Sequence, residues 1–190
     1  NLKMLLYREA VRDFTKAIEL DGTFLDAYFQ RGNAYRKFGD DTTFGKYKGA
    51  DRPELAIEDY SEAILLDPTN VLFLTSRGDT YAETAQYDLA IKDYDQAIKL
   101  DPDNSAVYQT RSQAFIELGN TAQAMRDLER ALQLNQENSE AYASRGEALL
   151  AMGQPQDAIK DFNKAIRLDN RNAIAYNGRG LTYIELGELL

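Results

Sequence analysis

Residues 71–104 read VLFLTSRGDTYAETAQYDLAIKDYDQAIKLDPDN, a stretch of 34 residues that contains two amphipathic segments. Small and large apolar residues recur at i, i+4 and i+7 in both segments: Leu74, Gly78 and Tyr81 in the first, and Ala90, Tyr94 and Ala97 in the second. This spacing places each trio on one side of a helix. Pro102 cannot continue the second helix, so the pattern predicts a helical hairpin that ends there.

The same template recurs along the chain, which predicts an all-α array of hairpins. Residues 105–138 and 139–172 are again 34 residues each and follow without a gap. The sequence predicts one array over 1–190 with these parts: a partial repeat at 1–24 that is mainly a second helix, a repeat at 25–70, repeats at 71–104, 105–138 and 139–172, and a partial repeat at 173–190 that supplies a first helix. One such hairpin cannot bury its apolar side alone and needs neighbours of the same kind.

This pattern resembles the tetratricopeptide repeat (TPR), of the type with Arg-Gly in the first helix of most repeats. The resemblance implies a right-handed superhelical solenoid of antiparallel helix pairs that binds peptides or protein partners in a concave groove. A lone match at one period would be weak, whereas consecutive units in register at a period of 34 are strong evidence.

Two segments depart from the template. The turn within the repeat 25–70 carries an insertion of about 12 residues within 40–53, which we expect to be an irregular loop followed by Pro53 in the first turn of the next helix. At the N-terminus, we expect Asn1–Leu6 to end a first helix and Tyr7–Leu20 to form a second helix. The missing initiator Met and the opening partway through a repeat predict a fragment of a longer protein.

Composition restricts the function. The net charge of −9 argues against nucleic-acid binding and against docking on anionic lipid, because both need clustered Lys and Arg. The chain has no Cys and no His, so thiolate nucleophiles, imidazole bases and the usual zinc sites are absent. We expect no catalysis, no cofactor and no metal. Without a membrane-spanning run the protein is expected to be soluble and by default cytoplasmic, although a targeting signal outside the fragment would change its location.

Two sets of residues are predicted to hold the hairpins together. Small residues should let paired helices approach closely: Gly32, Gly78, Ser112, Gly146 and Gly180 on first helices, and Ala10, Ala56, Ala90, Ala124 and Ala158 on second helices. An arginine directly before the small residue should pair with an aspartate of a second helix, in the same repeat or an adjacent one. We define these as the Arg–Asp ladder: Arg31 with Asp59, Arg77 with Asp93, Arg111 with Asp127, and Arg145 with Asp161. The ladder is interpreted as structural, because a planar guanidinium pairs two ways with a carboxylate and fixes helix register.

The TPR resemblance also implies which residues line the groove. The candidate partner-binding residues of the groove and the insertion are Phe29, Asn33, Arg36, Lys37, Phe44, Tyr47, Thr75, Asp79, Gln109, Gln113, Glu140 and Glu147. Some TPR proteins clamp the C-terminal carboxylates of chaperones with Lys, Arg and Asn at such positions. Neither registry tested on this sequence supplies those cations, so no chaperone-tail carboxylate clamp is expected.

The predicted groove changes character along the chain. Residues 29–53 hold six Lys/Arg and three Asp/Glu, a net charge of +3, so the rest of the chain carries −12. Phe29, Phe44 and Tyr47 beside these cations form the best candidate hot spot, since interface centres favour aromatics and Arg. A plainer reading is that Phe44 and Tyr47 only pin the insertion to its own repeat. Further along, Glu140, Glu147 and Glu185 beside Leu150, Leu181 and Ile184 would suit a basic and apolar partner.

The leading hypothesis is a non-catalytic scaffold or adaptor that binds a protein or peptide segment in the groove. The alternative is an architectural role, in which the open ends of the array associate with other copies or with further repeats of a larger protein. A third hypothesis, an RNA-binding helical repeat, needs a basic face and ranks last, because only the 29–53 region is basic.

Overall fold

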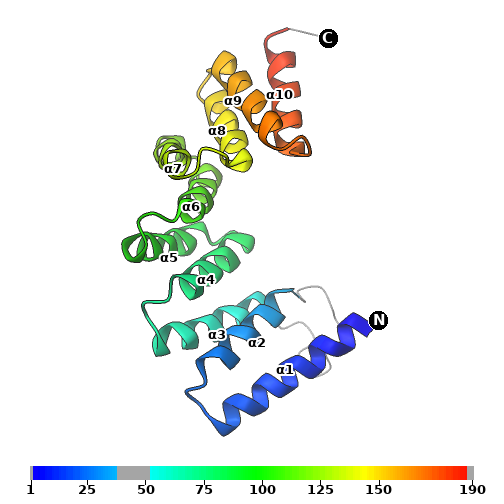
Figure 1. Ribbon diagram of the computed structural model, residues 1–190, viewed down its shortest axis with the longest axis vertical. Coiled ribbons are helices and arrows are strands. Elements are labelled where there is room, and N and C mark those ends of the chain that lie inside the picture. The colour runs from blue at the N-terminus through cyan, green and yellow to red at the C-terminus, as the bar shows by residue number, and fades with distance from the viewer. Residues whose placement is uncertain (1, 38–51, 188–190) are drawn as a thin grey trace. The chain divides into compact units, whose positions relative to one another are not determined.

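The computed structural model describes residues 2–37 and 52–187, and every regular element within these ranges is an α-helix (Figure 1). In chain order these are α1 (Leu2–Leu20), α2 (Leu25–Lys37), α3 (Arg52–Leu66), α4 (Val71–Glu83), α5 (Tyr87–Leu100), α6 (Ser105–Glu117), α7 (Thr121–Leu134), α8 (Ser139–Ala151), α9 (Pro155–Leu168) and α10 (Ala173–Glu185). The all-α prediction is confirmed. Most of the predicted insertion, residues 40–51, lies outside the described ranges, and Pro53 stands in the first turn of α3, as expected. Within those ranges no helix is long and apolar enough to cross a membrane.

The N-terminal helix differs from the prediction. Asn1–Leu6 and Tyr7–Leu20 were expected to belong to two helices, but α1 runs without a break from Leu2 to Leu20. This stretch contains neither Gly nor Pro, and a helix that has formed its first turn extends at little cost through residues that favour it. The expectation of a helix boundary at Leu6 is therefore wrong.

Local signals at the helix ends repeat with the hairpins. An asparagine precedes each of α4, α6, α8 and α10, namely Asn70, Asn104, Asn138 and Asn172. In three of the four, the carboxamide oxygen accepts a backbone N–H of the first helical turn that would otherwise lack a partner, at 2.9–3.1 Å. Pro68 and Pro102 follow the ends of α3 and α5, where neither helix can continue.

The chain divides into two units, Asn1–Leu100 and Asp101–Leu190, and each is described by itself. In both units successive helices pack side by side (Figure 1). The core of the first unit gathers around Tyr60, which contacts Phe29 at a ring separation of 5.7 Å. The second unit has two adjoining clusters, one around Leu128 and one around Phe162, both side chains being fully buried.

Close approach within a hairpin depends on the small residues. A methyl group on Gly32 or Gly78 would lie 2.8 Å from the ring of Tyr60 or Tyr94, and one on Gly146 would lie 2.6 Å from the ring of Phe162. Any side chain there would displace the facing aromatic ring. Gly180 differs from the prediction, because no described atom lies within 4 Å of the corresponding methyl position.

Candidate protein-binding surface

Four arginines of first helices each hold an aspartate of the second helix that follows. Each guanidinium donates from Nε and Nη2 to the two carboxylate oxygens of one aspartate: Arg31 to Asp59 at 2.8 and 2.6 Å, Arg77 to Asp93 at 2.8 and 2.7 Å, Arg111 to Asp127 at 2.7 and 2.6 Å, and Arg145 to Asp161 at 2.6 and 2.9 Å. The four aspartates are only 4–7% exposed. The structure thus brings together all four pairs of the Arg–Asp ladder.

The same arginines also contact the preceding second helix, which sequence reasoning left open. The Nη1 of Arg31 donates to the Thr15 hydroxyl at 3.1 Å, and that of Arg77 donates to the Ser61 hydroxyl at 2.9 Å. The partner stands 16 residues before the arginine in both cases. Each guanidinium therefore joins three consecutive helices, and the constant spacing of 16 was the available signal for the second contact.

These charges are occupied by internal partners. The hydrogen bond to the facing aspartate raises the pKa of Arg31, of Arg77 and of Arg145, and burial opposes that effect only in part. The guanidinium groups of Arg31 and Arg77 each use three of their five N–H donors within the protein. The first-helix residues that the TPR resemblance assigns to the groove are the other candidates for a binding surface.

The ninth residue of each first helix is hydrogen-bonded differently in the two units. In the first unit this residue is polar and accepts a hydroxyl proton from a second-helix tyrosine: Tyr60 Oη donates to Asn33 Oδ1 at 2.8 Å, and Tyr94 Oη donates to Asp79 Oδ1 at 2.9 Å. Burial raises the pKa of Tyr60 to about 12, so the phenol keeps its proton at neutral pH. The ninth position of the first unit is thus satisfied internally.

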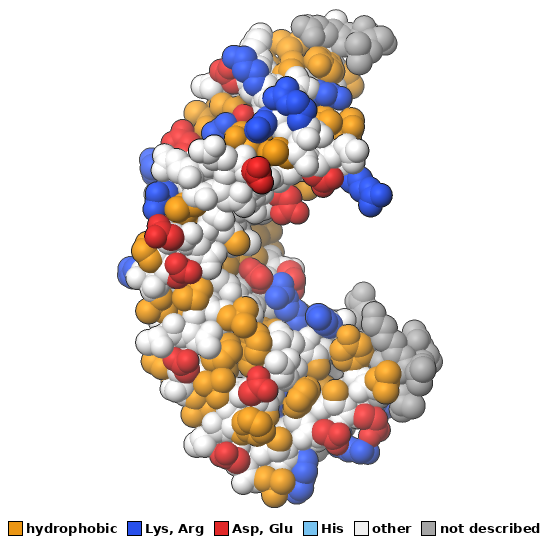
Figure 2. Space-filling view, viewed as in Figure 1, with side chains coloured by type: hydrophobic (Ala, Val, Ile, Leu, Met, Phe, Trp, Pro, Cys, Tyr) orange, Lys and Arg blue, Asp and Glu red, His pale blue; other side chains and the backbone are white. Residues whose placement is uncertain are grey.

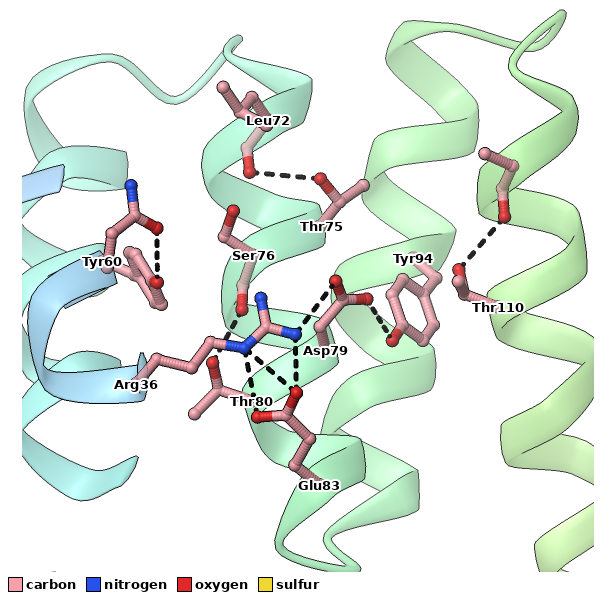
Figure 3. A network of polar contacts seen from close by, with 12 residues as sticks. Arg36, Tyr60, Leu72, Thr75, Ser76, Asp79, Thr80, Glu83, Tyr94 and Thr110 are labelled. Carbon is pink, nitrogen blue, oxygen red and sulfur yellow. Dashed lines mark hydrogen bonds and ion pairs between the residues drawn. The ribbon is translucent and has the colours of Figure 1, made fainter. Parts of the chain in front are cut away.

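Arg36 completes this internal network, which Figure 3 shows. Its guanidinium donates to both carboxylate oxygens of Glu83, with the shortest distance 2.7 Å from Nη2, and it reaches Asp79 at 3.4 Å. The hydrogen bond to Glu83 raises the pKa of Arg36. Arg36, a candidate partner-binding residue, is therefore already paired with two carboxylates of α4, and its contact with a partner stays a prediction.

The second unit lacks these internal donors. Its ninth positions are Gln113 on α6 and Glu147 on α8, but the second-helix residues in the place of the tyrosines are Leu128 and Phe162, which carry no hydroxyl. Glu147 forms no hydrogen bond or ion pair with any residue in the described ranges. Burial, and then the charge of Glu117, raise the pKa of Glu147 above its ordinary value. Two carboxylates therefore repel each other here, and neither forms an ion pair with any residue that the structure describes.

The other groove positions of the second unit carry both polar and apolar side chains. Gln113 donates to Glu117 at 3.1 Å within α6, and Gln109 donates to Glu140 at 3.1 Å across α6 and α8. Leu181 and Ile184, at the ninth and twelfth positions of α10, are 52% and 64% exposed. We call Gln113, Glu117, Glu147, Leu181 and Ile184 the acidic–apolar surface. Figure 2 shows that charged side chains of both signs are interspersed with apolar ones on the visible face of this unit.

The remaining predicted residues have other environments. Phe29 is only 8% exposed and packs against Phe73 at a ring separation of 4.9 Å, so its assignment to a partner-binding hot spot is corrected: it belongs to the core. Thr75 donates its hydroxyl to the carbonyl of Leu72 in its own helix, at 3.1 Å. Lys37 is exposed. Phe44 and Tyr47 lie outside the described residues.

Comparison with protein families gives matches over more than half of the chain. A family described as tetratricopeptide repeat matches residues 71–104, and one described as TPR repeat matches residues 113–153 and 146–187. A search of curated protein sequences found no match.

Solved structures share the fold. The crystal structure of MamA aligns with a TM-score of 0.76, 22% identity, and coverage of 88% of this chain and 91% of its own. A tetratricopeptide repeat protein from Parabacteroides merdae ATCC 43184 aligns with a TM-score of 0.82, 19% identity, and coverage of 98% and 70%. The first TPR of Spaghetti (RPAP3), bound to the HSP90 peptide SRMEEVD, is 30% identical over 64% of this chain and 96% of its own, with a TM-score of 0.60.

Proposed function

The chain belongs to the tetratricopeptide repeat family, and from this premise we propose that it is a non-catalytic scaffold that binds a basic and partly apolar segment of another protein on the acidic–apolar surface. The observation that carries the proposal is Glu147, a half-buried carboxylate that faces the charge of Glu117 and has no cationic partner in the described ranges. A partner's Lys or Arg placed between them would remove this repulsion.

The rest of the surface supports the same ligand chemistry. Leu181 and Ile184 expose most of their side chains on α10, the helix that packs against α8. Covering apolar area of this kind contributes about 25 cal/mol per Å². A segment that combines a cation with one or two apolar side chains would therefore use both the charge and the apolar part of the surface.

The sign of the charge distinguishes this chain from a relative with a bound peptide. The HSP90 peptide SRMEEVD in the first TPR of Spaghetti ends in Glu-Val-Asp. Two of these three residues are acidic, and the chain end adds a carboxylate. Glu117, Glu140 and Glu147 would repel such a tail. We propose that this chain does not clamp acidic chaperone tails and selects the opposite charge. Nucleic acid, which is also anionic, is disfavoured for the same reason.

The first unit offers a weaker case for the same role. Its ninth-position acceptors already hold tyrosine hydroxyls, and Arg36 is neutralised by Glu83 and Asp79. A ligand would have to break these bonds before it formed its own. The proposal therefore assigns the charge-selective contact to α6, α8 and α10.

The experiment is a selection from a random peptide library displayed on phage, with this chain immobilised. Selected peptides are expected to be enriched in Lys or Arg and in apolar residues. The double variant Glu117→Gln/Glu147→Gln should bind them at least about tenfold more weakly, because desolvated charge pairs contribute on this scale. The control is Asp79→Asn, which keeps an oxygen acceptor for Tyr94, as Asn33 does for Tyr60. Selection of acidic peptides, or binding unaffected by the double variant, would reject the proposal.

A further inference from the structure

A cavity of about 400 Å³ lies in the second unit, lined by side chains of α7, α8 and α9. Helix α8 packs against both of the other two helices (Figure 1). It contributes Arg145 and Leu149 to the cavity. These residues stand two positions before and after Glu147, and residues two positions apart lie roughly 200° apart around a helix. The cavity therefore opens on the side of α8 opposite to Glu147, away from the acidic–apolar surface.

The cavity lies where other repeats place an aromatic side chain. The eleventh residue of the first helix is aromatic in α2, α4, α6 and α10, namely Tyr35, Tyr81, Phe115 and Tyr183. In α8 the eleventh residue is Leu149, which has no ring. The aromatic residue at this position covers the ladder arginine of its own helix, since the Cζ of Arg77 lies 6.0 Å from the ring centre of Tyr81.

Arg145 consequently has less aromatic cover than its counterpart in α6. The Cζ of Arg111 lies 5.7 Å from the ring centre of Tyr108 and 5.8 Å from that of Phe115. The Cζ of Arg145 lies 5.4 Å from the ring centre of Tyr142, and Leu149 takes the place of the second ring. A planar ring in the cavity would restore the contact that α8 lacks.

A carboxylate at the cavity also differs from its counterparts. The Nη1 groups of three other first-helix arginines donate to the side chain 16 residues earlier, namely Thr15, Ser61 and Asn163. The residue 16 positions before Arg145 is Glu129, which lines the cavity and forms no hydrogen bond or ion pair with the residues that the structure describes. The hydrogen bond to Asp161 is the main cause that raises the pKa of Arg145, and the charge of Glu129 adds to it, so this carboxylate lies near the guanidinium.

The other charges of the lining are paired. Asp161 is held by Arg145, and Lys160 contacts Asp157 at 2.7 Å. The remaining charge at the cavity is therefore the negative charge of Glu129. The lining thus combines an uncovered guanidinium face, an apolar side chain and a carboxylate that can accept from a cation.

We propose that the cavity binds an aromatic ring that carries a protonated amine a short chain away, with the ring against Arg145 and Leu149 and the ammonium group at Glu129. Small-ligand sites have volumes of roughly 300–1,000 Å³, so the cavity has room for a group of this size. A free arylalkylamine and the N-terminal aromatic residue of a peptide both supply this chemistry. This second site is independent of the scaffold function proposed above.

NMR of the chain with 13C-labelled methionine methyl groups tests the proposal. Of the three methionines, Met125 lines the cavity and Met152 does not. Titration with 2-phenylethylamine is expected to shift the Met125 signal saturably through the ring current and to leave the Met152 signal in place. An unmoved Met125 signal would overturn the proposal.

Two further compounds separate the ring from the charge. The amine 2-cyclohexylethylamine has the same charge without an aromatic face and should bind about threefold more weakly, the scale of an exposed cation–π contact. The anion 3-phenylpropanoate has the ring with the opposite charge and should not bind. Equal affinity for all three compounds would contradict the proposed recognition.

Two variants test the residues. Leu149→Phe supplies the ring from within, as Phe115 does in α6, so it should keep the wild-type circular dichroism and lose the response to 2-phenylethylamine. Glu129→Gln should raise the Kd about threefold, the scale of an exposed charge pair. Glu137→Gln removes an exposed carboxylate in the turn between α7 and α8 and should leave the Kd unchanged. Wild-type affinity in Leu149→Phe, or equal effects of the two glutamine variants, would overturn the proposal.

A dipeptide distinguishes the two sources of the ligand. Tighter binding of the amide of Phe-Gly than of 2-phenylethylamine would assign the cavity to peptide N-termini, and weaker binding would assign it to free amines. Both results support the same ring and ammonium contacts. Basic peptides selected on the acidic–apolar surface should leave the Met125 signal in place, so this proposal and the proposed function can fail separately.

Discussion

The guanidinium of Arg77 and the carboxylate of Asp93 face each other through two parallel hydrogen bonds of 2.8 and 2.7 Å, although 16 residues separate them in the sequence. Since Arg77 also donates to Ser61 at 2.9 Å, one side chain links α3, α4 and α5. A planar donor group can satisfy both directions only at one relative height of the helices, so we interpret the pair as fixing helix register.

Arg77→Met is expected to lower the free energy of unfolding by about 3 kcal/mol, because it leaves the buried Asp93 carboxylate without its counter-charge. Chemical denaturation followed by circular dichroism measures the change. The matched variant Arg77→Met/Asp93→Leu removes both charges and should regain most of the loss. An Arg77→Met protein that unfolds at the wild-type denaturant concentration would show that the pair has no structural role.

Gly78→Ala and Gly180→Ala are expected to act in opposite directions. The added methyl on Gly78 lies 2.8 Å from the Tyr94 ring, so overpacking should exceed the gain in helix propensity and cost about 1 kcal/mol overall. The methyl on Gly180 meets open space and should stabilise α10 by about 0.5–1 kcal/mol. Thermal unfolding of the two variants compares them directly, and equal changes in both would argue against the close approach of α4 and α5.

Ala85→Gly is expected to stabilise the chain. Ala85 follows the end of α4 with φ of 58°, whereas the residues that take this left-handed conformation after α6 and α8 are Gly119 and Gly153. A side chain in this region costs about 1 kcal/mol relative to glycine. The melting temperature of Ala85→Gly should therefore rise, and that of Gly119→Ala should fall by a similar amount. A lower melting temperature for Ala85→Gly would contradict this reading of the turn.

Glu147→Gln is expected to stabilise the chain in a pH-dependent way. Burial and the charge of Glu117 raise the pKa of Glu147 above 4.5, so the folded chain binds its proton more tightly than the unfolded chain does. The carboxylate therefore destabilises the fold once the pH exceeds the unfolded pKa, an effect that grows until the folded pKa is passed. Because the group is partly solvated, the variant should melt only about 1–2 °C higher at neutral pH.

The pH series provides its own control. Below about pH 4 the side chain is protonated in both states, so wild type and Glu147→Gln should melt together. A stability difference that stayed constant from acid to neutral pH would show that the effect comes from something other than the ionisation of Glu147.

Much of the architecture could be predicted from residue spacing alone. The recurrence of Tyr81, Phe115 and Leu149 at intervals of 34 predicted first helices in phase with one another, and Arg77 and Asp93 hold the same offset as Arg111 and Asp127. Such features repeat with the hairpin, so each copy supports the interpretation of the others. The continuous α1 was missed because the template supplied a turn there that the local residues do not encode.

The binding surface was harder to predict, because it depends on side chains that differ between repeats. Phe29 occupies a position that is polar in the next two repeats, and only the packing of Phe73 against it shows that it is buried. The pairing of Arg36 with Glu83 spans 47 residues and an insertion. Glu83 recurs as Glu117 and Glu185, but no other repeat has an arginine in the place of Arg36. The tyrosine hydroxyls that satisfy Asn33 and Asp79 are visible in the sequence, but their partners become evident only in three dimensions.

The most direct test of charge-selective binding is a fluorescence anisotropy titration of one selected basic peptide against wild type, Glu147→Gln and Asp79→Asn. We predict that Glu147→Gln alone raises the Kd at least about fivefold and that Asp79→Asn leaves it unchanged, because Asp79 accepts from Tyr94 whereas Glu147 has no donor among the described residues. Equal affinity of the peptide for wild type and Glu147→Gln, or a greater loss in Asp79→Asn, would contradict the assignment of the binding surface to the second unit.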